Sequence, residues 1–340
     1  MNDYTKQLIS LETIKVLKLR FDSFPSEEIK TRNAPFHKAF LNAFSDKLSE
    51  MGTDVDAIIS MSSWMHGLNT TLGQSFFENV SHILCGGGKQ TFKNNSIYQS
   101  QASIISEIMT DLKNGVETPN VERELNLIAQ NANGDWQTVP DFTADCFYED
   151  EENVVAIELK SVRPNSGEMR GEKQKILLSK TALAHKYPNK KISYLFGFPF
   201  DPLASSDVGY DKCAFMDSII EFTKFCAKEE ILLSDELWSF LSGEEGTMLE
   251  VLTIIRSIAT PRFFEEFYFL SNTNNIALHK EAYLDILRRW NLFDEMIIAS
   301  HYEELLSSTN KKVQRAVRSS PFSEKGEYQK NRLECLKAEL

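Results

Sequence analysis

The sequence predicts an α/β protein in which a mixed β-sheet core is flanked by helices and accompanied by helical N-terminal and C-terminal parts. Three observations predict this class. Residues 139–148 and 154–160 alternate between apolar and polar side chains. An amphipathic stretch at 171–187 is followed by an apolar run at 192–198. Helical periodicity of three to four residues marks the chain before and after this region.

The two alternating stretches are expected to pair as an antiparallel hairpin. In 154–160 one side of the strand is apolar, and the other side carries Glu158 and Lys160. Strict period-two patterning is typical of half-buried strands. The polar segment 149–153 between the stretches indicates a turn.

The helix expected at 171–187 ends at Pro188, and the strand at 192–198 follows. A strand–helix–strand order of this length implies a parallel crossover, so the sheet should be mixed. Elsewhere we expect a helical block at about 54–84, broken near Gly67, and a long helix at 234–258. The chain then divides into three parts that are expected to form one compact unit: helical residues 1–112, the β-rich core 113–205 and helical residues 206–340.

Composition excludes several classes of protein. Of the 340 residues 42% are hydrophobic and 25% are charged, which is typical of a soluble globular chain. No apolar run approaches the roughly 18 residues that span a bilayer, so no membrane partner is expected. The N-terminus lacks the pattern of a secretion signal. The five cysteines are scattered and form no C-x-x-C pair, which disfavours a zinc site or a disulfide framework and fits a reducing cytoplasm.

The net charge of −12 at first argues against nucleic-acid binding. Charge is distributed unevenly, however. Residues 160–191 hold nine Lys/Arg against two Glu, and residues 310–332 hold seven against two, so the remaining chain carries −24. This asymmetry suits a confined cationic groove on an acidic body. The alternative is that both basic segments are solvated helix faces.

The hairpin carries the residues that indicate chemistry. Glu158 and Lys160 are two apart, so both project from the same face of one strand. A symmetric turn centred near residues 150–151 would place Asp141 opposite Lys160 and diagonal to Glu158. Two carboxylates and an ammonium would then converge, and hard oxygen ligands of this kind suit Mg²⁺ and phosphate chemistry. Asp145 shares the parity of Asp141 but lies roughly 13 Å further along the strand, too far to share one metal. We therefore expect it to have a structural role or to support the metal ligands indirectly. The alternative is a surface hairpin with an ordinary Glu–Lys pair.

Pro140-Asp141, sixteen residues, and then Glu158-Leu159-Lys160 resemble the signature of the PD-(D/E)xK nuclease superfamily. The segments 67–78, 139–142, 158–165 and 195–200 are similar to TdeIII-type type II restriction endonucleases, and the likeness extends over about residues 60–255. The resemblance implies a restriction-endonuclease-like fold. It also implies a Mg²⁺-dependent enzyme that cuts double-stranded DNA at a GGNCC-like palindrome and leaves 5′-phosphate ends.

The same resemblance implies a homodimer and a cognate DNA methyltransferase as genetic partner. Carried over position by position, Asp141, Glu158 and Lys160 match the catalytic core, with Asp141 and Glu158 as metal ligands. Glu78 matches an additional acid on a preceding helix. A solvent-exposed glutamate is the alternative for Glu78.

DNA contacts are expected in the loop and helix that follow the second strand of the hairpin. The candidates are Arg163, Asn165, Arg170, Lys173 and Lys175. An arginine on this loop could contact guanine in a G·C-rich target. Lys173 and Lys175 open the helix and would at most contact phosphate. The alternative is that the loop residues contact phosphate or solvent only.

Three competing functions remain open at this point. The first is a structure-selective or repair nuclease with the same core. The second is a DNA-binding or scaffold protein whose nuclease-like hairpin performs no chemistry. The third is a helical interaction protein without a nucleic-acid role, which would be consistent with the negative charge.

Overall fold

The computed structural model describes residues 1–25, 34–160 and 166–340. Within these residues the chain forms two compact units, of which the first comprises Phe77–Leu252 together with Met1, and the second comprises Asn2–Phe76 and Thr253–Leu340. The division into parts at 1–112, 113–205 and 206–340 was expected from the order of elements along the sequence. This three-part division stays a prediction.

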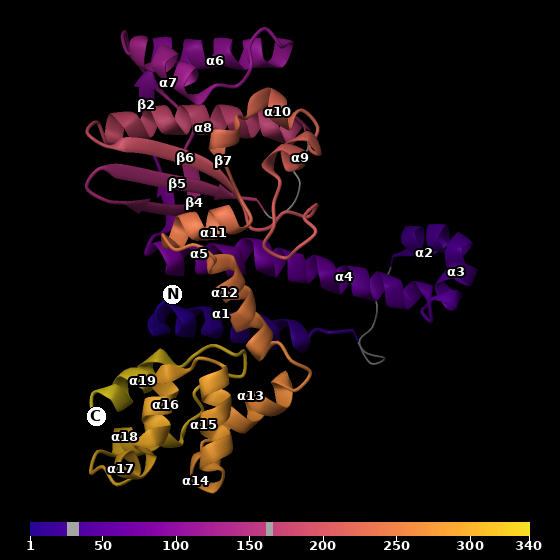
Figure 1. Ribbon diagram of the computed structural model, residues 1–340, viewed down its shortest axis with the longest axis vertical. Coiled ribbons are helices and arrows are strands. Elements are labelled where there is room, and N and C mark those ends of the chain that lie inside the picture. Colours follow the sequence, from indigo (N-terminus) through magenta and orange to yellow (C-terminus); the bar gives the residue numbers. More distant parts are fainter. Residues whose placement is uncertain (26–33, 161–165) are drawn as a thin grey trace. The chain divides into compact units, whose positions relative to one another are not determined.

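A five-stranded mixed sheet is the centre of the first unit (Figure 1). In spatial order its strands are β1 (Gly88–Phe92), β4 (Phe142–Glu149), β5 (Asn153–Leu159), β6 (Lys191–Phe198) and β7 (Ile231–Leu233). β4 pairs antiparallel with β1 and β5, whereas β6 pairs in parallel with β5 and β7. The expected hairpin, the parallel crossover and the fold class are therefore confirmed.

Helices cover both faces of this sheet (Figure 1). One face is packed by α8 (Ser166–Lys186) and α10 (Phe222–Phe225), with α6 (Gln99–Asn114) lying against α8, and the other by α5 (Phe77–Cys85) and α11 (Asp235–Ser242). On the first face Ala156 and Tyr194 join a hydrophobic core with Ile105 and Leu177. Because both faces are covered, residues 154–158 of β5 are all buried. The expectation of a half-buried strand was therefore wrong for β5.

The other elements of the first unit are short. They are the two-stranded sheet β2 (Ser96–Tyr98) and β3 (Trp136–Thr138), α7 (Val121–Gln130), α9 (Lys212–Asp217), a 3₁₀ turn at Lys228–Glu230 and the start of α12 (Thr247–Ile258). The single helix expected at 234–258 is two helices. Gly243 and Gly246 separate α11 from α12 with φ of +72° and +74°, a conformation that ends a helix and that glycine adopts without strain.

Apart from an isolated antiparallel bridge between Phe322 and Tyr328, the regular elements of the second unit in the described residues are helices. Its helices are α1 (Asp3–Phe21), α2 (Pro35–Leu41), α3 (Ser45–Glu50), α4 (Val55–Thr71), α13 (Phe263–Ser271), α14 (Asn274–Leu278), α15 (Lys280–Arg289), α16 (Phe293–Ser300), α17 (Tyr302–Leu306), α18 (Lys311–Arg318) and α19 (Lys330–Lys337). In the described residues none of the helices in either unit is long and apolar enough to cross a membrane.

The helix break expected near Gly67 is absent. α4 continues through Gly67 to Thr71 and is followed by a π-helical turn at Leu72–Phe76. A Cβ atom at Gly67 would lie 2.5 Å from Nη1 of Arg20. Glycine therefore allows the close approach of the Arg20 guanidinium to α4 and does not interrupt the helix.

Candidate active site

The turn between β4 and β5 sets the pairing of the hairpin. Asp150 Oδ1 accepts hydrogen bonds from the amides of Glu152 and Asn153 at 2.8 and 2.7 Å. The last pair of the ladder is Glu149 with Val154. The turn is therefore centred one residue later than the symmetric turn expected from the sequence. Its aspartate satisfies turn amides that would otherwise lack a partner.

This register changes which acid faces Glu158. The ladder pairs Cys146 with Ile157, and one further step brings Asp145 opposite Glu158. At that step the Leu159 amide donates to Asp145 Oδ2 at 3.0 Å, so a side chain accepts a bond from the β5 backbone. Asp145 and Glu158 are thus cross-strand neighbours, and the structural role expected for Asp145 understates its position.

Asp141 lies elsewhere. It precedes β4, is exposed, and accepts a hydrogen bond from the Asn94 amide at 3.0 Å. Four residues separate it from Asp145, which is roughly 13 Å along a strand. The expectation that Asp141 pairs with Lys160 and lies diagonal to Glu158 is corrected by the shifted turn.

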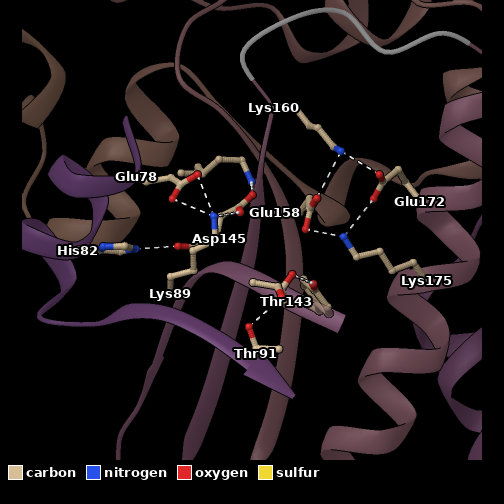
Figure 2. Close-up of polar contacts among 12 residues, drawn as sticks. Glu78, His82, Lys89, Thr91, Thr143, Asp145, Glu158, Lys160, Glu172 and Lys175 are labelled. Atoms are coloured by element: carbon tan, nitrogen blue, oxygen red, sulfur yellow. Dashed lines mark hydrogen bonds and ion pairs between the residues drawn. The ribbon is translucent and has the colours of Figure 1, made fainter. Parts of the chain in front are cut away.

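Glu158 and Lys160 meet two residues of α8 (Figure 2). Lys160 Nζ lies 2.9 Å from Glu172 Oε1 and 3.4 Å from Glu158 Oε1. Lys175 Nζ lies 2.8 Å from Glu158 Oε2 and 3.7 Å from Glu172 Oε2. Two carboxylates and two ammonium groups therefore alternate around a closed ring of contacts.

A second group adjoins this ring at Asp145 (Figure 2). Lys89 of β1 lies 3.1 Å from Glu78 Oε2 and 3.3 Å from Asp145 Oδ1. His82 of α5 donates through Nε2 to the Asp145 carbonyl oxygen at 2.7 Å. Glu78 thus faces the site expected for it and reaches Asp145 through a shared ammonium. We call the whole set the acid–lysine cluster: Glu78, Lys89, Asp145, Glu158, Lys160, Glu172 and Lys175.

The electrostatics of the cluster follow from burial and from its surplus of acids, four carboxylates against three ammonium groups. Burial raises the pKa of Glu158, the contact with Lys175 opposes this rise, and the charge of Asp145 adds to it. Burial lowers the pKa of Lys160, but its contacts with Glu172 and Glu158 outweigh burial, so that its pKa lies above the ordinary value. The Lys160 ammonium therefore stays charged, while the facing carboxylates of Asp145 and Glu158 repel each other.

The periodicity of α8 decides which of its residues reach the cluster. Glu172 and Lys175 are three residues apart and share one face of the helix. Lys173 lies on another face, which it shares with the buried residues Ile176 and Leu177, three and four positions further along the helix. The Lys173 side chain is 0% exposed.

Lys173 was expected to contact DNA, and this expectation is corrected. Its Nζ lies 2.7 Å from Oε2 of Glu124 and 2.7 Å from Oε1 of Glu230, and both carboxylates are 1% exposed. The Lys173 ammonium is neutralised by these two buried carboxylates and is enclosed by the protein, so it cannot contact a DNA phosphate. Lys173 is thus part of the core.

The other expected DNA contacts are divided between different environments. Arg163 and Asn165 lie outside the described residues. Arg170 is exposed on α8, as a DNA contact would require. Lys175 belongs to the acid–lysine cluster and contacts Glu158 directly. Lysines with acidic partners at close range account for much of the local excess of positive charge at 160–191, as Lys190 with Glu149 at 2.8 Å also illustrates.

Sequence reasoning missed Glu172 and Lys89, and it gave Asp145 the wrong weight. Asp150 followed by Asn153 is a turn signal that would have moved the turn centre by one residue and favoured Asp145. The spacing of Glu172 and Lys175 was visible, but nothing local indicated that their face, and not that of Lys173, points to β5.

Two comparisons with known proteins bear on this geometry. A family model described as type II restriction endonuclease, HinfI, matches residues 1–259. The type II restriction enzyme MjaII of Methanocaldococcus jannaschii is 48% identical over 347 aligned positions, which cover 95% of this chain and 94% of that protein. The expected class, a restriction endonuclease acting on DNA, is confirmed, and the narrower TdeIII-type likeness stays a prediction. The chain belongs to the HinfI family of type II restriction endonucleases.

Proposed function

We propose that this chain hydrolyses phosphodiester bonds in double-stranded DNA with Mg²⁺ and leaves 5′-phosphate and 3′-hydroxyl ends. The observation that supports it best is the meeting of Asp145, in the middle of β4, with Glu158 and Lys160 at the end of β5. Glu158 and Lys160 would correspond to the (D/E)xK part of the PD-(D/E)xK motif. Asp145 supplies the first half in place of Asp141.

The residues present fit a magnesium ion. In the described part of the chain no group of three or more His, Cys, Asp or Glu side chains forms a ready-made metal cage. Mg²⁺ does not need one, because it commonly takes one or two carboxylates and completes its shell with water and phosphate. Asp145 and Glu158 offer those oxygens. Burial raises the pKa of Glu158 and the charge of Asp145 adds to the rise, so a bound cation would stabilise the charged form of this carboxylate. A bound Mg²⁺ supplies polarisation of the phosphate and a lower pKa for attacking water.

The lysines of the cluster have a separate role in this proposal. Glu172 holds the Lys160 ammonium 2.9 Å away, on the side of β5 where Glu158 lies. From there Lys160 can stabilise the negative charge that develops on the phosphorus oxygens. Water adds to phosphorus as the bond to O3′ breaks, and the phosphate stays on the 5′ end. We assign Glu78 an indirect role, because it reaches Asp145 through Lys89.

The target we propose is a short palindrome of the GGNCC type, which the TdeIII-type resemblance implies. Arg163, Asn165 and Arg170 are the proposed DNA contacts. One active site cuts one strand, so a two-fold target calls for a homodimer. A cognate DNA methyltransferase would protect the host genome, and the cytoplasm is the proposed compartment.

Digestion of phage DNA of known sequence, with and without Mg²⁺, tests the proposal. Discrete fragments that end at one sequence are expected, and only with the metal. Fragments of random length would instead support a structure-selective nuclease. Ends accepted by ligase without prior phosphorylation would support the 5′-phosphate chemistry.

A matched pair of variants tests the assignment of the acid. Asp145→Asn should lower the single-turnover cleavage rate by about 10²-fold or more, because it removes a charged oxygen from the centre of the cluster. Asp141→Asn keeps an oxygen for the Asn94 amide and should cut like the parent. DNA binding, measured by gel shift with Ca²⁺ in place of Mg²⁺, should persist in both. The reverse pattern of rates would return the role to Asp141.

A further inference from the structure

The segment that contains α2, α3 and most of α4 has no hydrophobic core of its own. Of residues 34–70, which we call the α2–α4 arm, not one is buried. α2 has seven residues and α3 has six. Helices this short are not stable in water on their own, because helices in proteins are held chiefly by packing of an apolar face. In the second unit the arm receives little such packing.

The arm nevertheless carries large apolar side chains. The most exposed are Phe36 at 79%, Phe40 at 78%, Met51 at 76% and Phe44 at 51%, followed by Met65 at 42% and Met61 at 39%. Phe36 and Phe40 are four residues apart and share a face of α2. At about 200 Å² for each aromatic or methionine side chain, the arm exposes about 700 Å² of apolar surface. Large apolar areas exposed on a protein surface mark sites of interaction, so the arm is suited to a partner.

The local charge indicates the kind of partner. The arm holds two lysines against four acids, a formal balance of −2. DNA phosphates would be repelled by such a surface. One lysine is also engaged within the arm, since Lys38 Nζ lies 2.6 Å from Asp56 Oδ1 and joins α2 to α4. A protein surface is therefore the partner that fits.

We propose that the α2–α4 arm is the dimer interface of this enzyme and that the arm of a second copy covers it. A standard interface buries about 800 Å² on each partner, and homodimer interfaces are about 65% apolar, so the exposed apolar area of the arm is sufficient. A two-fold interface uses the same surface on both copies, so the apolar side chains of one arm would pack against those of the other. The inference rests on the proposed function in one respect: cleavage of both strands of a palindrome calls for a second copy of this chain.

Sedimentation equilibrium of the full-length chain tests the interface. The parent should sediment as a dimer of the 38.8 kDa chain. The double variant Phe36→Asp/Phe40→Asp should raise the dimer dissociation constant by about 10²-fold or more, since two aromatic anchors are lost and four charges face one another across the interface. Leu278→Asp on α14 is the matched control, because Leu278 is 70% exposed in the same unit and outside the arm. It should leave the dissociation constant unchanged.

Circular dichroism and thermal melting establish whether the variants are folded. If the aspartate variant is unfolded, Phe36→Ala/Phe40→Ala repeats the sedimentation measurement without added charge. A double variant that dimerises like the parent overturns the proposal, as does a parent that is monomeric with and without DNA. Glu158→Gln separates this outcome from the proposed chemistry, because it should abolish cleavage and still dimerise. On supercoiled plasmid, the double variant should accumulate nicked circles where the parent yields linear DNA.

Discussion

Replacement of Lys173 by methionine tests whether this lysine of α8 belongs to the core. Methionine nearly preserves the length and the apolar contacts of the side chain, so the substitution chiefly removes the charge. Glu124 and Glu230, each 1% exposed, would then face each other without the ammonium between them. Breaking a buried ion pair by removal of one partner costs about 3–5 kcal/mol, because the remaining charge stays buried.

The structure favours the lower part of this range. Lys180 is also buried, and burial lowers its pKa; Glu230 raises that pKa and the charge of Lys173 lowers it. When Lys173 is removed this repulsion is lost, so Lys180 holds its proton more readily and offsets part of the lost charge. For a unit of this size the loss corresponds to a fall in melting temperature of about 6–12 °C.

Thermal and urea denaturation followed by circular dichroism measure the effect. Arg170→Met is the control on the same helix, because Arg170 is exposed and its loss should change the free energy of unfolding by no more than about 0.5 kcal/mol. Adding Glu124→Gln to Lys173→Met should restore part of the stability. If Lys173→Met instead melts like the parent and binds DNA with a shallower salt dependence, Lys173 contacts phosphate and our reasoning is wrong.

Three further predictions concern the five-stranded sheet, the acid–lysine cluster and His185 of α8. Gly197→Ala should cost about 1–3 kcal/mol in urea denaturation, because its Cβ would lie 2.9 Å from Ile157 Cγ2 and 3.1 Å from Leu237 Cδ1; parent-like stability would show that β5 and α11 yield easily. Lys160→Ala should slow single-turnover cleavage by about 10²–10³-fold and spare DNA binding, whereas an unchanged rate would remove Lys160 from the mechanism. Burial lowers the pKa of His185, so the unfolded chain binds the proton more readily, and stability should be lost as pH falls through the ordinary histidine range. His185→Gln should flatten this dependence of the melting temperature between pH 8 and 5. An equally steep curve for the variant would contradict the prediction.

Local patterns were sufficient to predict the hairpin and the crossover. The alternation at 154–160 and the polar turn before it are properties of neighbouring residues, and β5 indeed follows β4 in antiparallel pairing. The same local parity correctly put Glu158 and Lys160 on one side of one strand. The burial of that strand on both faces was not visible, because it depends on α11, which lies far along the chain.

The alternation did not identify the facing acid, since Asp141 and Asp145 have the same parity. The choice between them depends on one residue of turn geometry, which Asp150 fixes through the Glu152 and Asn153 amides. A shift of the turn centre by one residue moves every partner across the hairpin by two. Parity is kept by such a shift, and so the sequence pattern looks equally good in both registers.

By itself the sequence determined the class of protein, the hairpin and the strand that carries Glu158 and Lys160, because backbone alternation and turn chemistry act between near neighbours. Tertiary structure alone decided that Glu172 and Lys175 complete the ring of contacts and that Lys173 is buried in the core. Those outcomes depend on the orientation of α8, which is set by packing between segments distant in the chain.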